Sequence, residues 1–358
     1  MKRLNSFYNI CLVASILLLS IQSSVDAQSI ESKIDSLLNE KYADNSTGGV
    51  YFISKNGVPI YKKAFGHSNL ELETPMSVDN VFEIGSITKQ FTAISIMMLV
   101  EQGKIKVSDP VSAFIPEYPN GDIITIHHLL THTSGIRDFV KVKGLNKIAK
   151  EELTAEEMVD FFKNEPMDFQ PGEKFEYNNA GYILLGYIIE LVTEKSYAEF
   201  VSEQIFGRLD MTDSYYASHQ TIIPNRAYGY NQKNGELINN RYISFSIPFS
   251  SGSLMSTVDD MFKWQEGIKN NVLINEETTS MVFRDYHLND GSPINYGYGW
   301  HIKSLNGSKS YQHGGAIFGF KSMGVYLPEE DIYVIALTNC WCNSPTNITR
   351  EIARLVAE

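Results

Sequence analysis

The stretch FEIGSITKQFTAISIMMLVEQGKI, residues 82–105, sets Ser86 and Lys89 three residues apart at the head of a long apolar segment. Within residues 91–100 only two side chains are polar. A helix that is apolar on nearly all sides is a buried helix. The stretch therefore predicts a buried helix that runs from Ser86 to about Glu101.

Ser86 and Lys89 would share one face of that helix, because residues three apart are neighbours on a helix surface. Burial lowers the pKa of an amine, and the positive end of the helix dipole lowers it further. A neutral lysine beside a serine is a general base beside a nucleophile. The alternative, from these residues alone, is that Ser86 caps the helix and Lys89 extends to solvent.

Strand-like segments stand at both ends of the chain. Residues 48–66 contain two of them around Asn56 and Gly57, a pair typical of a hairpin turn. Four more are predicted at 296–302, 310–314, 320–328 and 332–339. Amphipathic helices are predicted at 30–42 and 347–358.

The middle of the chain has the apolar spacing of helices. Apolar residues recur at intervals of three and four in the segments 155–164, 180–192, 196–206 and 253–268. Residues 211–250 are irregular and rich in Tyr, Asn and Ser.

The simplest arrangement is an α/β fold of the α+β type, with one antiparallel sheet flanked by helices and an inserted all-helical region. We expect one domain over residues 28–358. Its sheet part would comprise 28–104 and 285–358, and its mainly helical insert 105–284.

The segment FEYNNAGY, residues 175–182, places Tyr177 and Asn179 two positions apart before another apolar helix. In an extended or looped segment both side chains can point into one cleft. A phenol can relay a proton, and an asparagine can orient an amide. On this stretch alone, an Asn capping a helix beside a packing Tyr is the simpler interpretation.

A third segment, YQHGGAIFGF at residues 311–320, places His313 at the end of a strand, followed by two glycines. Glycine permits a close approach of the backbone to a ligand. Read alone, the segment also fits a Gly-Gly turn with an incidental histidine.

Together, S-I-T-K at Ser86, Y-N-N at Tyr177 and H-G-G at His313 resemble the ordered motifs S-x-x-K, Y-x-N and K/H-x-G of the serine β-lactamase and penicillin-binding protein superfamily. The resemblance is closest to the branch that holds class C β-lactamases, D-alanyl-D-alanine carboxypeptidases and esterases. It extends from about residue 30 to the end and includes ITIHHLLTHTSGI (124–136) and PGEKFEYNNAGYILLGYIIE (171–190).

This resemblance implies a β-lactamase/transpeptidase-like fold and an acyl-enzyme on Ser86, with no cofactor. It implies that Lys89 is the base or assists it. Tyr177 would carry a proton to the leaving group and activate water for deacylation. The backbone N–H groups of Ser86 and Ala316 would form an oxyanion hole. The residues implied to bind substrate are Asn179, His313, Gly315 and Ala316.

His313 stands where many β-lactamases have a lysine. A lysine would supply a full positive charge for a substrate carboxylate and for lowering the pKa of Tyr177, whereas histidine is mostly neutral at pH 7. We therefore expect weak or no turnover of penicillins. Rapid hydrolysis of a chromogenic cephalosporin would contradict this prediction.

The bulk composition narrows the function classes. The chain has 358 residues, a formal net charge of -12 and a pI near 5.2. A general nucleic-acid binder would usually carry a basic face, so no nucleic-acid partner is expected. The expected partner is a small-molecule or peptide substrate.

The N-terminus has the pattern of a cleaved signal peptide over residues 1–27. Lys2 and Arg3 precede a 12-residue apolar run at 10–21, and small residues lead to a cut after Ala27. The run is too short to span a bilayer as a stable helix. We expect export to the periplasm or the medium and no membrane span in the mature chain. The alternative is an uncleaved membrane anchor.

Pairs of cysteines and histidines raise the possibility of other chemistry. Cys340 and Cys342 would point the same way in an extended segment, but so short a ring would be strained, so two free, partly buried thiols are expected. His128 and His132 have metal-ligand spacing but no evident third ligand, so no metal site is expected. The absence of G-x-S-x-G in the sequence argues against an α/β-hydrolase.

Two functions fit these residues. The first is an exported serine hydrolase that cleaves an amide, a peptide (including D-amino-acid peptides) or an ester. The second is a non-catalytic or very slow binder of peptidoglycan-type ligands on the same fold. A pure binder need not retain Lys89 and Tyr177 together, which favours the hydrolase.

Overall fold

The computed structural model describes residues 30–42 and 47–358. The predicted signal peptide lies outside the described residues. In the part of the chain that the structure describes, no helix is long and apolar enough to cross a membrane.

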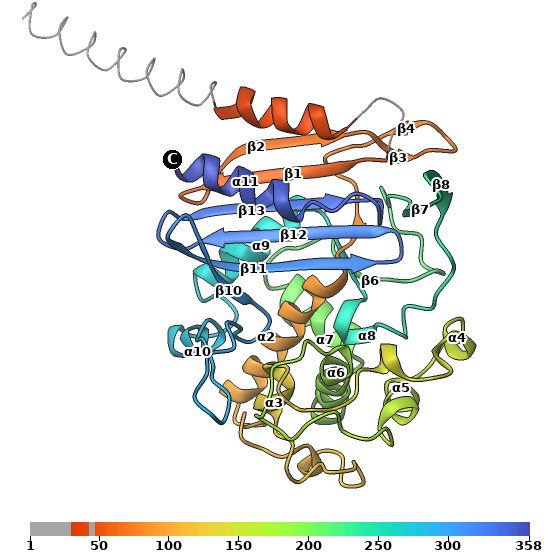
Figure 1. Cartoon of the computed structure of the whole chain (residues 1–358), viewed down its shortest axis with the longest axis vertical. Helices are drawn as coiled ribbons and strands as arrows, with labels where there is room; N and C mark the ends of the chain where they lie inside the picture. Colours follow the sequence, from red (N-terminus) through yellow and green to blue (C-terminus); the bar gives the residue numbers. More distant parts are fainter. Residues whose placement is uncertain (1–29, 43–46) are drawn as a thin grey trace, which may run out of the picture.

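A six-stranded antiparallel sheet is built from both ends of the chain (Figure 1). Its order is β10 (His301–Leu305), β11 (Ser308–Ile317), β12 (Phe320–Leu327), β13 (Ile332–Thr338), β1 (Gly49–Lys55) and β2 (Val58–Phe65). The two ends meet where β1 pairs with β13. The predicted hairpin is confirmed: Asn56 and Gly57 both have positive φ, as a tight turn of this kind requires.

Most of the helices come from the part of the chain that lies between the two groups of strands in sequence. They are 30–41, α2 (Thr88–Glu101), α3 (Ile126–Leu130), α4 (Leu145–Ile148), α5 (Ala155–Phe162), α6 (Asn179–Thr193), α7 (Tyr197–Val201), α8 (Phe249–Gly252), α9 (Val258–Lys269), α10 (Glu276–Val282) and α11 (Thr346–Ala357). Short helical turns are η1 (Gly85–Ile87), η2 (Val111–Ala113), η3 (Phe139–Lys141) and η4 (Ser202–Phe206).

Helices cover the sheet on both faces, and β13 shows how the sequence specifies this. Every residue of β13 is buried. Alternate side chains belong to different cores, because successive residues of a strand point to opposite faces. Val334 and Ala336 pack with α11 and the helix at 30–41, whereas Ile335 and Leu337 belong to the core that contains α2 and α9.

Short strands form small additional sheets in the connecting segments, and three parts of the chain differ from the prediction. Residues 211–250 are not uniformly irregular, since β7 and β8 form a hairpin there. The segment predicted as a helix from 253 begins with a strand, and most of 296–302 is loop. The short strands are β3 (His67–Asn69), β4 (Thr74–Pro75), β5 (Phe82–Glu83), β6 (Tyr215–Tyr216), β7 (Tyr230–Lys233), β8 (Glu236–Asn239) and β9 (Leu254–Ser256).

The buried helix predicted from Ser86 is confirmed, with one refinement. Ser86 lies in η1, a single 3-10 turn that leads directly into α2. Residues 88–99 of α2 are all buried. Gly85 has φ +55, and a Cβ there would lie 2.8 Å from the backbone nitrogen of Ala316. Glycine at this position therefore lets η1 approach the end of β11, which brings Ser86 to the boundary between sheet and helices.

The expectation of two free thiols is wrong: Cys340 and Cys342 form a disulfide. The expectation assumed that the strand continues through both cysteines. Instead β13 ends at Thr338, and the chain turns at residues 341–342. The turn brings the two Cα atoms to 5.1 Å, within the range that a disulfide can bridge.

Candidate active site

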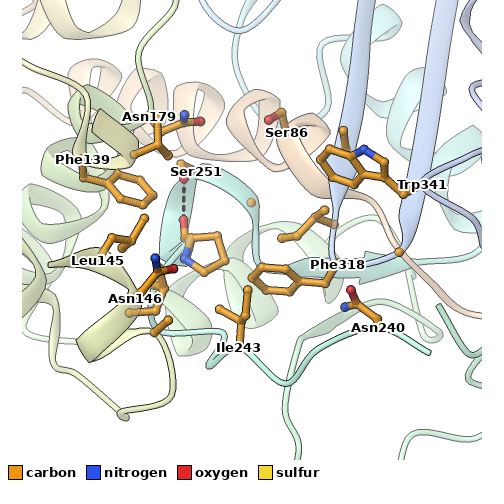
Figure 2. A pocket seen from close by; sticks show the side chains of 18 of the residues that line it. Ser86, Phe139, Leu145, Asn146, Asn179, Asn240, Ile243, Ser251, Phe318 and Trp341 are labelled. Carbon is orange, nitrogen blue, oxygen red and sulfur yellow. Dashed lines mark hydrogen bonds between the residues drawn. The ribbon is translucent and has the colours of Figure 1, made fainter. Parts of the chain in front are cut away.

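A pocket of about 440 Å³ lies beside Ser86. Figure 2 shows Ser86 and Asn179 on one side of it, with Leu145 and Ile243 across from them and Trp341 on the flank. Its walls come from η3, α4, α8, the start of α6, the turn between β11 and β12, and the disulfide turn. Ser86 is partly exposed, so its hydroxyl is open to a bound molecule.

Lys89 is completely buried and points its amine at Ser86. Its Nζ lies 3.2 Å from Ser86 Oγ, 2.8 Å from Asn179 Oδ1 and 2.9 Å from the carbonyl oxygen of Ser251. Burial lowers the pKa of Lys89 to about 7, against an opposing effect of the nearby Asp138 carboxylate. At neutral pH a large fraction of Lys89 is therefore uncharged.

The three contacts of Lys89 fit the neutral amine. A neutral amine has two N–H groups and one lone pair. Asn179 Oδ1 and the Ser251 carbonyl can only accept hydrogen bonds. In the ammonium form, Nζ donates to all three oxygens. In the neutral form, the two acceptors take both N–H groups, which leaves the lone pair for the hydroxyl of Ser86. This is the arrangement that a general base needs beside its nucleophile.

Asn179 is fixed by Asp138, a residue that the sequence analysis did not single out. Its Nδ2 donates to Asp138 Oδ2 at 2.9 Å, and its backbone N–H donates to the same oxygen at 3.1 Å. The side-chain amide is thereby oriented with Oδ1 toward Lys89. Asn179 also lines the pocket, so it can contact a substrate while it holds the lysine.

Tyr177 lies against the same amine. Lys89 Nζ is 4.9 Å from the centroid of the Tyr177 ring. Among the described residues its buried hydroxyl has no hydrogen-bond partner of standard geometry, although Ser86 is close enough to lower its pKa. Burial is the larger effect and raises the pKa of Tyr177 well above its usual value. The phenol is therefore protonated at neutral pH.

His313 is buried beside Tyr177, with the two ring centroids 5.9 Å apart, at the end of a chain of hydrogen bonds. The backbone N–H of Asn178 donates to His132 Nδ1 at 3.1 Å, so neutral His132 carries its proton on Nε2. That nitrogen lies 3.2 Å from the hydroxyl of Tyr296, which lies 3.3 Å from His313 Nε2. His313 Nδ1–H donates to the carbonyl of Gly314 at 2.7 Å.

Neutral imidazoles satisfy every bond in this chain. Tyr296 accepts from one histidine and donates to the other, which leaves His313 with no free nitrogen. Burial lowers the pKa of both His132 and His313 well below the ordinary value. The third motif therefore contributes no positive charge at neutral pH.

The two remaining predicted residues lie on β11, next to Ser86. Ala316 lines the pocket, and Gly315 does not. A Cβ at Gly315 would lie 2.0 Å from the carbonyl oxygen of Ile84, so only glycine lets β11 pack against the residues that precede Ser86. The structure thus brings Ser86, Asn179 and Ala316 together in the pocket wall. Lys89 and Tyr177 lie buried next to Ser86, and His313 lies beside Tyr177.

Three contributors were absent from the sequence-based prediction. Asp138 follows the turn after α3 and carries no motif of its own. Ser251 acts through its backbone carbonyl, which any residue provides. Tyr296 lies in a segment that was predicted to be a strand. His132 was considered only as a metal ligand, and the structure assigns it to the hydrogen-bond chain instead.

Known proteins were compared with the chain in sequence and in structure. The family model described as Beta-lactamase matches residues 34–358. A penicillin-binding protein of Bacillus subtilis (strain 168) is 28% identical over 318 residues, which cover 84% of this chain and 69% of that protein.

Solved structures give the same result for the fold. The octameric penicillin-binding protein homologue from Pyrococcus abyssi superposes with a TM-score of 0.78 at 30% identity, covering 93% of this chain and 78% of that one. The D-amino acid amidase from Ochrobactrum anthropi SV3 also reaches 0.78, at 22% identity, covering 93% and 99%. At this low identity, the similarity to the amidase shows a shared fold only. The chain belongs to the beta-lactamase family.

Proposed function

We propose that this protein is an exported serine hydrolase that forms an acyl-enzyme on Ser86 and cleaves an amide, a peptide or an ester. The observation that carries the proposal is the geometry at Lys89. A buried amine with a pKa near 7 lies 3.2 Å from the hydroxyl of a partly exposed serine, and two acceptors that can take both N–H groups of its neutral form lie at 2.8 Å and 2.9 Å.

The proposed reaction has two steps. Ser86 Oγ bonds to the substrate carbonyl carbon while its proton moves to Lys89, and backbone N–H groups of Ser86 and Ala316 stabilise the oxyanion. The bond to the leaving group then breaks, and the leaving group takes a proton through Tyr177. Water next attacks the ester on Ser86, which releases a carboxylic acid and restores the serine hydroxyl.

Export is supported by two features. The apolar run at residues 10–21 follows Lys2 and Arg3 and precedes small residues up to Ala27. The disulfide between Cys340 and Cys342 suits an oxidising compartment.

Intact-protein mass spectrometry tests the proposal directly. The mature protein is mixed with a fluorescent penicillin and with p-nitrophenyl esters, and mass spectra are taken over time. We expect an added acyl mass on the wild-type protein that Ser86→Ala lacks. Its decay rate separates a hydrolase from a slow-turnover binder. A folded protein that gains no Ser86-dependent adduct from any ester would contradict an acyl-enzyme mechanism.

A further inference from the structure

The pocket beside Ser86 is uncharged. None of the described residues that line it is Asp, Glu, Lys or Arg. Its polar groups are serine hydroxyls and the amides of four asparagines. The rest of the wall is apolar, and its large members are Phe139, Leu145, Ile243, Ile247, Phe318 and Trp341. Two lysines lie close to lining residues without lining the pocket themselves. Lys89 contacts Ser86 and Asn179 from behind, and Lys321 lies over the Trp341 ring at 5.3 Å from its centroid.

The charged groups behind the pocket are already engaged by the protein. Lys89 is fully buried and has three protein partners, so it has no free donor for a substrate carboxylate. Both nitrogens of His313 are hydrogen-bonded. Asp138 accepts two hydrogen bonds from Asn179 and is itself buried, so it cannot pair with a substrate ammonium.

We infer that this pocket binds a neutral, apolar part of the substrate, and that the preferred substrates are esters or amides with neither a carboxylate nor an ammonium group in the part that enters the pocket. A buried charge without a partner is strongly disfavoured, because it loses its hydration and gains nothing in return. The inference rests on the proposed function and adds the substrate class to it.

The size and shape of the pocket fit this class. About 440 Å³ is enough for a ring or a branched or medium-length chain. Phe318 and Trp341 offer aromatic surfaces, and Phe139 and Leu145 line the side across from Trp341 (Figure 2). The asparagine amides can bond to neutral carbonyl groups without requiring a charge on the ligand.

Matched p-nitrophenyl esters test the inference. The neutral substrates are p-nitrophenyl hexanoate and p-nitrophenyl methyl adipate, and the charged ones are mono-p-nitrophenyl adipate and the ester of 6-(trimethylammonio)hexanoic acid. We expect kcat/KM for both charged esters to be about 100-fold lower than for the neutral esters, because the pocket offers no counter-charge. The methyl ester controls for chain length, since it differs from the adipate only in the masked carboxylate.

A pocket variant supplies the reverse experiment. Ile243 is partly buried, so a lysine can replace it with its amine near solvent. Ile243→Lys should raise the ratio of kcat/KM for the adipate over its methyl ester by about 10-fold or more, and Ile243→Met should leave the ratio unchanged. An unaltered ratio in Ile243→Lys would place the acyl chain elsewhere and overturn the inference.

The outcomes separate the two proposals. If wild-type protein hydrolyses the charged and neutral esters equally well through Ser86, the substrate class is wrong and the serine hydrolase stands. If no ester acylates Ser86 in folded protein, the proposed function fails and the inference fails with it.

Discussion

Replacing Ser86 with alanine should lower kcat/KM for any substrate that the protein turns over by at least about 10⁴-fold, as removal of the nucleophile does in other serine enzymes. The hydroxyl oxygen of Ser86 is the atom that would form the acyl bond. Among the described residues that line the pocket, the other serine, Ser251, donates its hydroxyl to the carbonyl of Pro248 at 2.6 Å. Initial rates with the best neutral ester measure the effect. Reversible binding of the substrate should be largely retained, because the pocket walls are unchanged.

Ser95→Ala is the matched control for this substitution. Ser95 lies on α2, is buried and donates its hydroxyl to the carbonyl of Phe91, away from the pocket. Its loss should leave the rate within about a factor of two. If Ser86→Ala kept more than about a tenth of the wild-type rate, Ser86 would not be the nucleophile.

The sequence predicted those parts of the fold and site that depend on local pattern. Ser86 and Lys89 are three residues apart on one helical turn, so their contact follows from helix geometry. The apolar segment that follows them specifies burial, and burial specifies the direction of the pKa shift of Lys89. The antiparallel sheet followed from strand-like segments at both ends of the chain.

Other parts depend on contacts between distant segments and could not be predicted in this way. Asp138 and Asn179 are 41 residues apart, and nothing local marks them as partners. His132 and Tyr296 are separated by 164 residues. The disulfide was missed for a different reason, because the position where β13 ends decides whether Cys340 and Cys342 can meet.

Lys89→Met should lower kcat/KM by about 10³-fold, the usual size of a lost general base. Methionine has a similar length and needs no proton or charge in the buried site. In the wild-type protein the rate should fall as the pH decreases through an apparent pKa of about 7, because protonated Lys89 has no lone pair for Ser86. The pH–rate profile of kcat/KM between pH 5 and pH 10 measures this.

The pH at which the rate falls on the acid side of the profile, called the acid limb, also shows whether Lys89 or Tyr177 is the base. Burial raises the pKa of Tyr177, so a phenolate base would produce activity only at strongly alkaline pH. Lys104→Met is the control, since Lys104 is exposed just after α2. It should leave both the rate and the profile unchanged. An acid limb near 7 that persists in Lys89→Met would assign it to another group.

Stability should report the same titration independently. The folded pKa of Lys89 is about 7, and the unfolded value is near 10.5. Between these values the unfolded chain binds a proton that the folded protein does not, so the free energy of unfolding should rise with pH across this window. Below pH 7 both states bind the proton, and the cost of burying the ammonium is fully present.

Lys89→Met cannot titrate, so the stability of the wild-type protein relative to this variant should increase from pH 7 to pH 10 in urea unfolding. Parallel curves would show that the buried amine is not perturbed, and a base on Ser86 would then have to come from elsewhere.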